Sequence, residues 1–209
     1  MDHVVKGVEK FQSEAYVEKK ELFEQLATGQ APEVLFVTCA DSRIDPGLIT
    51  QTNPGDLFVC RNAGNIVPPF SGQTSGEIAS IEYAVAALGV QHIVVCGHTE
   101  CGAMKGAMAP ESLAGVPNVA DWLKHSVTAT EVVKERCGGS LCGDNLLEVI
   151  EENVLQQIQH LKTHPKVAAK VAAGTLKLHG WVYDIKTGGI TAFDEAAGKF
   201  APLADVQAS

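Results

Sequence analysis

The segment VLFVTC at residues 34–39 decides how the rest of the chain is interpreted. It is short, apolar and partly β-branched, which is typical of a strand buried on both faces of a sheet. Similar runs occupy residues 57–60 and 92–96, and further strands are predicted over residues 175–184 and 190–193. The chain therefore supplies about four to five strands for one sheet.

Helical periodicity separates these runs. Ser75 is the predicted N-cap of a helix over residues 75–88, which Gly89 ends. Residues 116–161 are predicted to be mostly helical, with Asp144 capping the stripe Leu147, Ile150, Val154, Ile158 and Leu161. A further short helix is predicted from Pro165 to Gly174. Strands alternating with helices indicate an α/β fold with a mainly parallel sheet flanked by helices.

The first thirty residues carry two apolar stripes that do not lie on the same face of a single continuous helix. This pattern predicts two helices, or an arm that packs on a partner subunit. The stripes consist of Val4, Val8, Phe11 and Ala15, and of Leu22, Phe23 and Leu26. We therefore expect one domain over residues 1–209, with an N-terminal helical arm at 1–30 and an α/β core with a C-terminal segment at 31–209.

The composition excludes several kinds of partner. The 209 residues include 16 basic and 25 acidic side chains, a net charge of −9, and no Lys/Arg cluster that could bind nucleic acid. No apolar run approaches the roughly 18 residues of a membrane span. The first ten residues, MDHVVKGVEK, do not read as a signal peptide. We expect a cytoplasmic protein with neither a nucleic acid nor a membrane as partner.

Two of the six cysteines fall where a ligand site is expected. Cys39 ends the first predicted strand and Cys101 lies just past the third, and sites in parallel sheets form beyond the carboxyl ends of the strands. With His98 they make a soft set of three ligands that suits zinc and leaves a fourth tetrahedral position open, as in catalytic sites. The alternatives are that the thiols only pack and that His98 caps the next helix.

For the other four cysteines the sequence does not predict a role in this metal site. Cys60 and Cys96 lie inside apolar strands, where a thiol usually packs as a small hydrophobe. Cys137 and Cys142 flank Gly138-Gly139 in a predicted loop. Free thiols, a loop disulfide and a second metal site all stay open for this pair.

Three separated segments resemble the signature of the β-class carbonic anhydrases: CADSR at 39–43, RNAGN at 61–65 and GHTECG at 97–102. The resemblance extends from the N-terminal helices to HGWVY at 179–183. It implies a zinc lyase that reversibly hydrates carbon dioxide to bicarbonate and a proton by zinc-hydroxide attack. One Zn²⁺ per chain would be bound by Cys39, His98 and Cys101.

The resemblance also implies the roles of residues around the metal. Asp41 and Arg43 would form a catalytic dyad in which the ionised carboxylate accepts a hydrogen bond from the hydroxide, although an aspartate at this position can instead become the fourth zinc ligand. Four residues would bind substrate, three of them matching the plant-like branch of the family and the last through its backbone N–H: Gln30, Phe58, Tyr83 and Gly102. Because two thiolates offset the charge of the ion, activity should rise on the alkaline side of neutrality.

Assembly and location follow from the same resemblance. It implies a homodimer at minimum, with a tetramer or larger assembly left open, and Gln30 acting across a subunit boundary. The segments are most similar to cyanobacterial carboxysomal enzymes, but the C-terminal extension of those enzymes is not seen before Ser209, so we expect the cytoplasm rather than the carboxysome. The alternative functions are a related zinc hydrolase of carbon disulfide or carbonyl sulfide, and a non-catalytic scaffold subunit.

Overall fold

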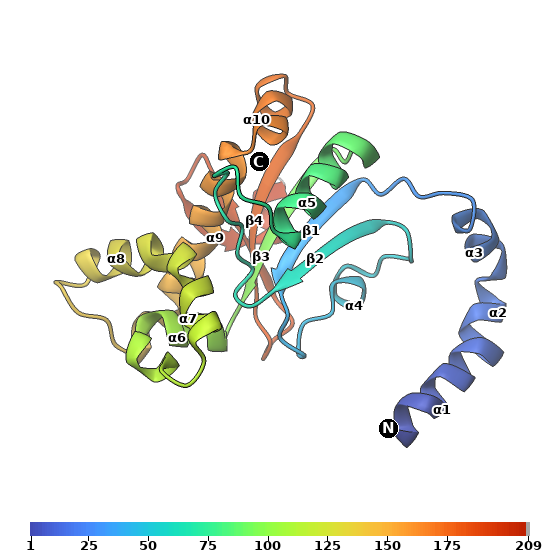
Figure 1. Ribbon diagram of the computed structural model, residues 1–209, viewed down its shortest axis with the longest axis horizontal. Helices are drawn as coiled ribbons and strands as arrows, with labels where there is room; N and C mark the ends of the chain where they lie inside the picture. The colour runs from blue at the N-terminus through green and yellow to red at the C-terminus, as the bar shows by residue number, and fades with distance from the viewer. Residues whose placement is uncertain (208–209) are drawn as a thin grey trace. The chain divides into compact units, whose positions relative to one another are not determined.

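A single sheet organises the larger part of the chain (Figure 1). The computed structural model describes residues 1–207, and within them six strands pair in the order β2-β1-β3-β4-β5-β6. The strands are β1 (Val34–Cys39), β2 (Leu57–Asn62), β3 (His92–His98), β4 (Lys177–Tyr183), β5 (Ile190–Asp194) and β6 (Lys199–Pro202). The first four are mutually parallel, and β5 and β6 add antiparallel pairs.

The predicted α/β fold with a mainly parallel sheet is confirmed. The prediction of four to five strands missed β6 (Lys199–Pro202), which has only four residues and ends in a proline, a residue that strands disfavour. The segment is a strand because it pairs with β5 in antiparallel register, and its own sequence does not show this.

The helices of this part of the chain alternate with the strands as far as β4. They are α4 (Pro46–Thr50), α5 (Gly76–Glu82), α6 (Gly102–Met108), α7 (Pro117–Trp122), α8 (Val127–Arg136), α9 (Leu146–Thr163), α10 (Pro165–Ala172) and α11 (Leu203–Gln207). Ser75 caps α5 as predicted, because its hydroxyl accepts a hydrogen bond from the Ile78 N–H at 3.3 Å. A π-helical turn, Tyr83–Leu88, continues α5 to the left-handed Gly89.

The start of α9 differs from its prediction. Asp144 is not the cap; it lies in a separate 3₁₀ turn, Gly143–Asn145, and Asn145 is the residue before α9. The turn closes through reciprocal contacts between Cys142 and Asn145, which a helical periodicity does not reveal. As a result Leu146 is buried, whereas Leu147, predicted to lie on the buried stripe, is 48% exposed.

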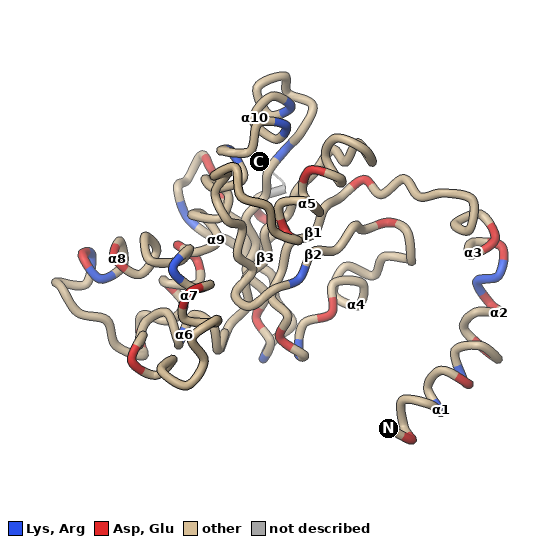
Figure 2. Tube along the Cα trace, in the orientation of Figure 1, with Lys and Arg blue, Asp and Glu red and all other residues tan. Residues whose placement is uncertain are grey.

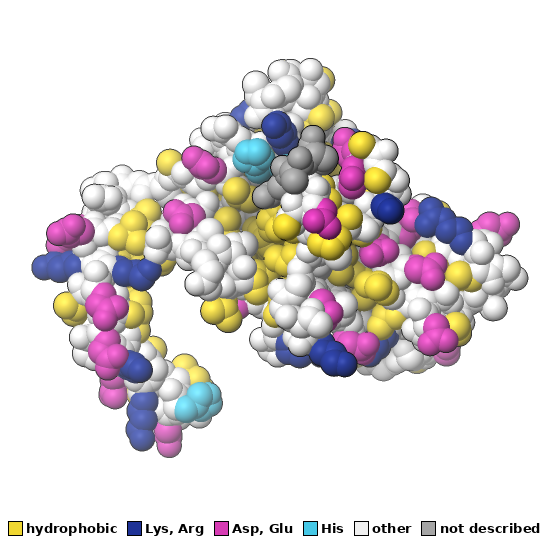
Figure 3. Space-filling view, turned by 180° about the vertical axis from the view of Figure 1, so that it is seen from behind, with side chains coloured by type: hydrophobic (Ala, Val, Ile, Leu, Met, Phe, Trp, Pro, Cys, Tyr) yellow, Lys and Arg dark blue, Asp and Glu magenta, His cyan; other side chains and the backbone are white. Residues whose placement is uncertain are grey.

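The two faces of the sheet are covered unequally. Helices α9 and α5 pack on one face, over β3 and β4 and over β2 respectively, and the larger core lies there. The opposite face carries a small cluster of Phe36, Ile44, Val94 and Cys96. Figure 3, which shows the molecule from behind, has hydrophobic side chains gathered over a hollow in the middle of this part of the chain.

Residues Met1–Ala31 form a compact unit of their own, separate from the unit that begins at Pro32. Its helices are α1 (Asp2–Lys10), a π-helical segment Phe11–Ala15, α2 (Tyr16–Glu18) and α3 (Lys20–Leu26). Phe11, Tyr16 and Phe23 contact one another, with ring centroids 5.1–6.0 Å apart. The predicted helical arm is confirmed, while the single-domain organisation stays a prediction.

The charges are mixed along the chain. Figure 2 shows Lys and Arg interspersed among Asp and Glu. Two exposed ion pairs join residues four apart in the N-terminal unit, Lys10–Glu14 and Lys20–Glu24. No helix within residues 1–207 combines the length and the apolar composition that a bilayer crossing requires.

Two glycines let α9 approach the sheet closely. A Cβ on Gly97 of β3 would lie 3.0 Å from Cγ2 of both Ile150 and Val154. A Cβ on Gly180 of β4 would lie 2.9 Å from Val154 Cγ1 and 3.0 Å from Ile158 Cδ1. Because Gly97 directly precedes His98, this packing fixes the end of β3.

Replacing Gly180 by Ala should therefore destabilise the chain. Overpacking a well-packed core typically lowers the free energy of unfolding by about 1–3 kcal/mol, which urea or thermal unfolding would measure. Gly115→Ala is the matched control, because nothing lies within 4 Å of its added Cβ. Equal unfolding midpoints for the two variants would contradict the close-packing argument.

Candidate active site

Three potential metal ligands meet at one edge of the sheet. β1 and β3 pair in parallel, so Cys39 and His98 end neighbouring strands at the same edge. Cys101 directly precedes α6 and returns to this edge. The side chains of Cys39, His98 and Cys101 are buried, and their ligand atoms all lie within 4.8 Å of one another.

The imidazole of His98 is prepared for a metal ion. Its Nδ1 donates to the carbonyl of Thr99 at 2.8 Å, which leaves the lone pair on Nε2. Among the described residues, Nε2 is buried and has no hydrogen-bond partner, an arrangement that normally costs free energy. Zinc–sulfur and zinc–nitrogen bonds of about 2.3 and 2.0 Å can reach three ligand atoms that all lie within 4.8 Å of one another. The donor set therefore fits zinc.

The two thiols share an environment that favours one thiolate. The neighbouring Cys101 and His98 side chains and the Gly64 N–H lower the pKa of Cys39, and the Gly64 nitrogen lies 3.4 Å from its sulfur. The adjacent Cys39 sulfur and burial raise the pKa of Cys101. A divalent cation would take the place of the proton that the pair shares.

The remaining buried cysteines behave differently. Burial raises the pKa of Cys60 to about 11 and that of Cys96 to about 12. Both side chains belong to the hydrophobic clusters of the sheet. Their predicted role in packing is confirmed.

Asp41 and Arg43 form a bidentate ion pair beside the candidate metal ligands. Arg43 Nε and Nη2 donate to Asp41 Oδ1 and Oδ2 at 2.9 and 2.7 Å, and the Arg43 backbone N–H donates to Oδ1 at 3.0 Å. The guanidinium holds the pKa of the Asp41 carboxyl well below its usual range, so this group is ionised at neutral pH. Asp41 Oδ2 lies 3.8 Å from His98 Nε2.

Backbone contacts hold this pair at the metal ligands. Arg43 Nη2 also donates to the carbonyl of Glu100 at 3.2 Å, which links the segment after β1 to the one after β3. Glu100 has a φ of 58°, in the left-handed region, so the chain turns sharply between His98 and Cys101.

Arg61 is a positioning residue that the sequence did not assign. Its Nε donates to the Cys39 carbonyl at 3.0 Å and its Nη2 to the Asp41 carbonyl at 2.7 Å. Arg61 pairs with Thr38 in the β1–β2 register, one step from Cys39. That register was the signal that could have identified it, but it is known only once the strands are aligned.

The rest of the RNAGN segment, residues 61–65, is a scaffold. The Asn62 side chain accepts from the Ile66 N–H at 2.7 Å and donates to the Ile66 carbonyl at 2.8 Å, which closes the turn. Gly64 has a φ of 81°, and a Cβ there would lie 2.9 Å from Met104 Cε. Only glycine fits at this position, which brings the Gly64 N–H to the Cys39 sulfur.

Two of the predicted substrate-binding residues, Phe58 and Tyr83, lie apart from Cys39 of the same unit. Phe58 and Tyr83 contact each other with ring centroids 6.0 Å apart, but Phe58 pairs with Leu35, four positions before Cys39 and about 13 Å away along the strand. Gly102 opens α6 next to Cys101. Gln30 is exposed and belongs to the N-terminal unit.

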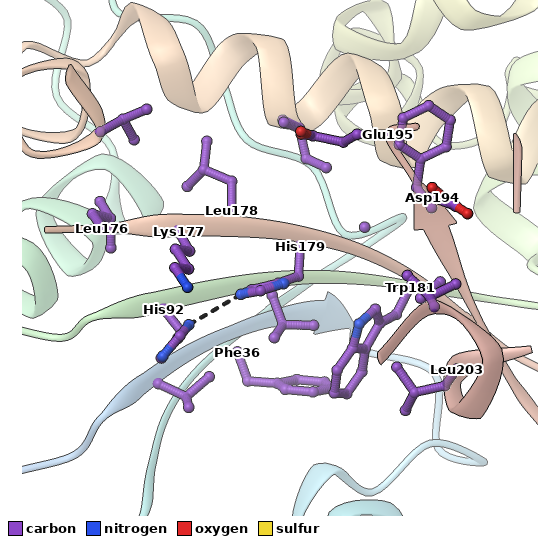
Figure 4. A pocket seen from close by; sticks show the side chains of 18 of the residues that line it. Phe36, His92, Leu176, Lys177, Leu178, His179, Trp181, Asp194, Glu195 and Leu203 are labelled. Atoms are coloured by element: carbon purple, nitrogen blue, oxygen red, sulfur yellow. Dashed lines mark hydrogen bonds between the residues drawn. The ribbon is translucent and has the colours of Figure 1, made fainter. Parts of the chain in front are cut away.

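A cavity of about 940 Å³ extends along β4 and is lined by residues from both faces of the sheet, and it is not the active site. Neither the three ligands nor Asp41 lines it. Figure 4 shows His92 and His179 pointing toward each other inside it, with His92 Nδ1 3.0 Å from His179 Nε2 and Phe36 and Trp181 beyond them.

Known proteins are similar to this chain in both sequence and fold. A family model described as carbonic anhydrase matches residues 34–190. The carbonic anhydrase of Synechococcus elongatus is 47% identical over 189 residues, which cover 90% of this chain and 70% of the relative. The carbonic anhydrase of Pseudomonas aeruginosa is 47% identical over 205 residues, which cover 98% and 93%.

Solved structures give the same result. The β-carbonic anhydrase CcaA superposes with a TM-score of 0.93 at 42% identity, covering 97% of this chain and 98% of that one. A tetrameric β-carbonic anhydrase of Sordaria macrospora superposes with a TM-score of 0.82 at 32% identity, covering 96% and 98%. The chain belongs to the β-class carbonic anhydrase family, as its three segments predicted. It is an enzyme, and its reaction is the hydration of carbon dioxide.

Replacing Arg61 by Met should weaken metal binding. The change removes two hydrogen bonds that hold the Cys39 and Asp41 carbonyls, and loss of such supporting contacts typically costs about 10–100-fold in metal affinity. Competition with a chromogenic chelator for zinc would measure the affinity. Arg136→Met is the control, because Arg136 pairs with Glu152 on the surface at 2.8 Å, and an identical zinc affinity in both variants would refute the positioning role.

Proposed function

We propose that Cys39, His98 and Cys101 hold one Zn²⁺ per chain, which serves the reversible hydration of carbon dioxide to bicarbonate and a proton. The observation that carries this proposal is the unpartnered, buried His98 Nε2 among two thiols, with the Asp41 carboxylate 3.8 Å away. When bound, zinc supplies Lewis acidity that lowers the pKa of a bound water, so that hydroxide is available to attack carbon dioxide near neutral pH.

Asp41 orients the nucleophile in this proposal. Its carboxylate stays ionised because Arg43 neutralises it, so it accepts a hydrogen bond and directs a lone pair of the nucleophile toward the substrate carbon. Both carboxylate oxygens are engaged by the guanidinium, which favours this role over that of a fourth zinc ligand. Arg43 and Arg61 are positioning residues, since they act through Asp41 and through the backbone around Cys39.

The substrate pocket is completed across a subunit boundary. Gln30 hydrogen-bonds carbon dioxide or bicarbonate, Phe58 and Tyr83 wall the cleft, and the Gly102 N–H offers another donor. The support for a neighbouring subunit is the distance of about 13 Å along the strand between Phe58 and Cys39 of one chain. An apolar wall with few donors suits a small, uncharged substrate.

The assembly is a homodimer at minimum. The tetrameric Sordaria macrospora relatives support an oligomer, as do the exposed apolar side chains Val4, Val5, Val8 and Val17 of the N-terminal unit. The enzyme works in the cytoplasm in this proposal. All six cysteines are free, and a thiolate metal centre keeps its ligands in a reducing compartment.

Stopped-flow hydration of carbon dioxide across pH tests the zinc and dyad assignments together. Wild type should carry one zinc per chain, and its rate should rise on the alkaline side of neutrality, because two thiolates offset the charge that acidifies the water. Asp41→Asn should lower kcat by about 10²-fold through loss of orientation, with zinc content unchanged. Asp121→Asn, which alters a surface carboxylate paired with Lys124, is the control.

Three results would overturn this proposal. A rate already flat below pH 6.5 would contradict the thiolate argument. Sulfide release from carbonyl sulfide or carbon disulfide that exceeds carbon dioxide hydration would favour the related hydrolase. One zinc per chain without any hydration would favour a scaffold subunit.

Subunit mixing tests the shared pocket. If Gln30 serves the partner's zinc, a mixed dimer of an Asp41→Ala chain and a Gln30→Ala chain contains one complete site and should recover about half of the wild-type activity per dimer. Doubly tagged hetero-oligomers, purified after co-expression, would provide the sample. Mixing Asp41→Ala with Arg43→Met is the control, because both residues belong to one chain's site and no recovery is expected. No recovery in the first mixture would place Gln30 in its own chain's site.

A further inference from the structure

Cys137 and Cys142 bound a tight loop between α8 and α9. Cys137 ends α8, and its N–H donates to the Val133 carbonyl at 3.0 Å. Gly138 and Gly139 then adopt φ values of 78° and 99°, which reverse the chain, and Cys142 precedes the 3₁₀ turn that leads into α9. Both thiols are exposed and free. In Figure 1 this loop runs from the outer end of α8 back toward α6.

The two sulfurs are neighbours across a single amide group. Asn145 Nδ2 donates to Cys137 Sγ at 3.1 Å, and Cys142 Sγ donates to Asn145 Oδ1 at 3.4 Å. The same Oδ1 accepts from the Cys142 backbone N–H at 3.1 Å. One side chain of the turn before α9 therefore holds both thiols. Packing does not explain this pair, because neither thiol belongs to the hydrophobic core.

The two thiols have different surroundings. Cys142 is exposed and lines a cavity of about 420 Å³ together with Leu146 and the Lys105–Glu100 ion pair, so a small molecule can approach this residue. Cys137 lies 3.9 Å from the Glu148 carboxylate, and partial desolvation and that negative charge raise the pKa of its thiol. Because the thiolate is the attacking species, Cys142 is the better first nucleophile.

We propose that Cys137 and Cys142 form a redox modification site that closes into a reversible intrachain disulfide by exchange with a low-molecular-weight disulfide such as oxidised glutathione. The Cys142 thiolate attacks one sulfur of that disulfide, whose S–S bond breaks and releases one thiolate. Cys137 then gives its proton to solvent and attacks Cys142 Sγ, which breaks the mixed disulfide and releases the second thiol. The chain loses two electrons and two protons, and the small disulfide is reduced to two thiols.

The new bond would change the contacts at the start of α9. Asn145 can no longer accept from the Cys142 thiol, and its amide must move from between the two sulfurs. The turn that caps α9 loosens as a result, while Asn153 and Ile150, further along the helix, keep their contacts with Gly64 and Gly97. The metal ligands Cys39 and Cys101 are buried and take no part.

Thiol mapping of the zinc-loaded enzyme tests the proposal. After equilibration with oxidised glutathione, alkylation should miss both exposed thiols, and the peptide that contains them should be lighter by two hydrogens. Dithiothreitol should restore both. Hydrogen exchange should become several-fold faster over residues 143–148 in the oxidised form, with zinc content unchanged.

Serine variants separate the two roles. Serine retains a side-chain acceptor at the cap, so the turn is preserved. Cys137→Ser should stop at a glutathione adduct on Cys142, whereas Cys142→Ser should leave Cys137 unmodified over the same time. The proposal fails if both wild-type thiols stay open to alkylation or if the bond joins two chains on a non-reducing gel. It also fails if a Cys137→Ser, Cys142→Ser double variant shows the same faster exchange over residues 143–148 after the same treatment.

Discussion

Parallel pairing of β1 with β3 ends both strands at one edge of the sheet, and it is there that Cys39 and His98 leave their strands. The two residues are far apart in sequence, so this pairing alone brings their ligand atoms within 4.8 Å. A slip of one residue would turn each side chain to the opposite face. The apolar runs on both strands resist such a slip, because they are buried over nearly the full length of the pairing. The candidate metal centre therefore depends on the register of these two strands.

Helix α9 packs against the segments that position the site. Its residues Ile150 and Val154 lie against Gly97, directly before His98, so the end of β3 cannot shift without moving the helix. Three residues further along from Ile150, Asn153 donates to the Gly64 carbonyl at 3.1 Å, and the N–H of the same glycine faces the Cys39 sulfur. One helical face thus contacts both segments that carry the candidate metal ligands. Close packing of this kind transmits displacement because protein interiors have little free volume.

The sequence predicted what depends on local pattern and missed what depends on tertiary register. Apolar runs identify β1 and β3, and the strand-end rule draws attention to Cys39, His98 and Cys101 from the amino-acid order alone. The role of Arg61 was missed because its two carbonyl partners lie on another strand and in the segment that follows it. The Asp144 cap was wrong because the 3₁₀ turn before α9 is closed by Cys142 and Asn145, a contact without periodicity. The separation of Phe58 from Cys39 likewise follows from a pairing that composition does not contain.

Charge balance explains why Asp41 and Arg43 occur together. In the proposed zinc site two thiolates would neutralise the divalent ion, so a carboxylate 3.8 Å from His98 Nε2 would add an uncompensated negative charge in a partly buried place. The Arg43 guanidinium offsets that charge and donates hydrogen bonds to both carboxylate oxygens. Its further bond to the Glu100 carbonyl ties the arginine to the segment that carries Cys101. The same side chain therefore sets both the ionisation and the orientation of Asp41 beside the candidate ligands, and in the proposed zinc site this would leave the fourth ligand position to water.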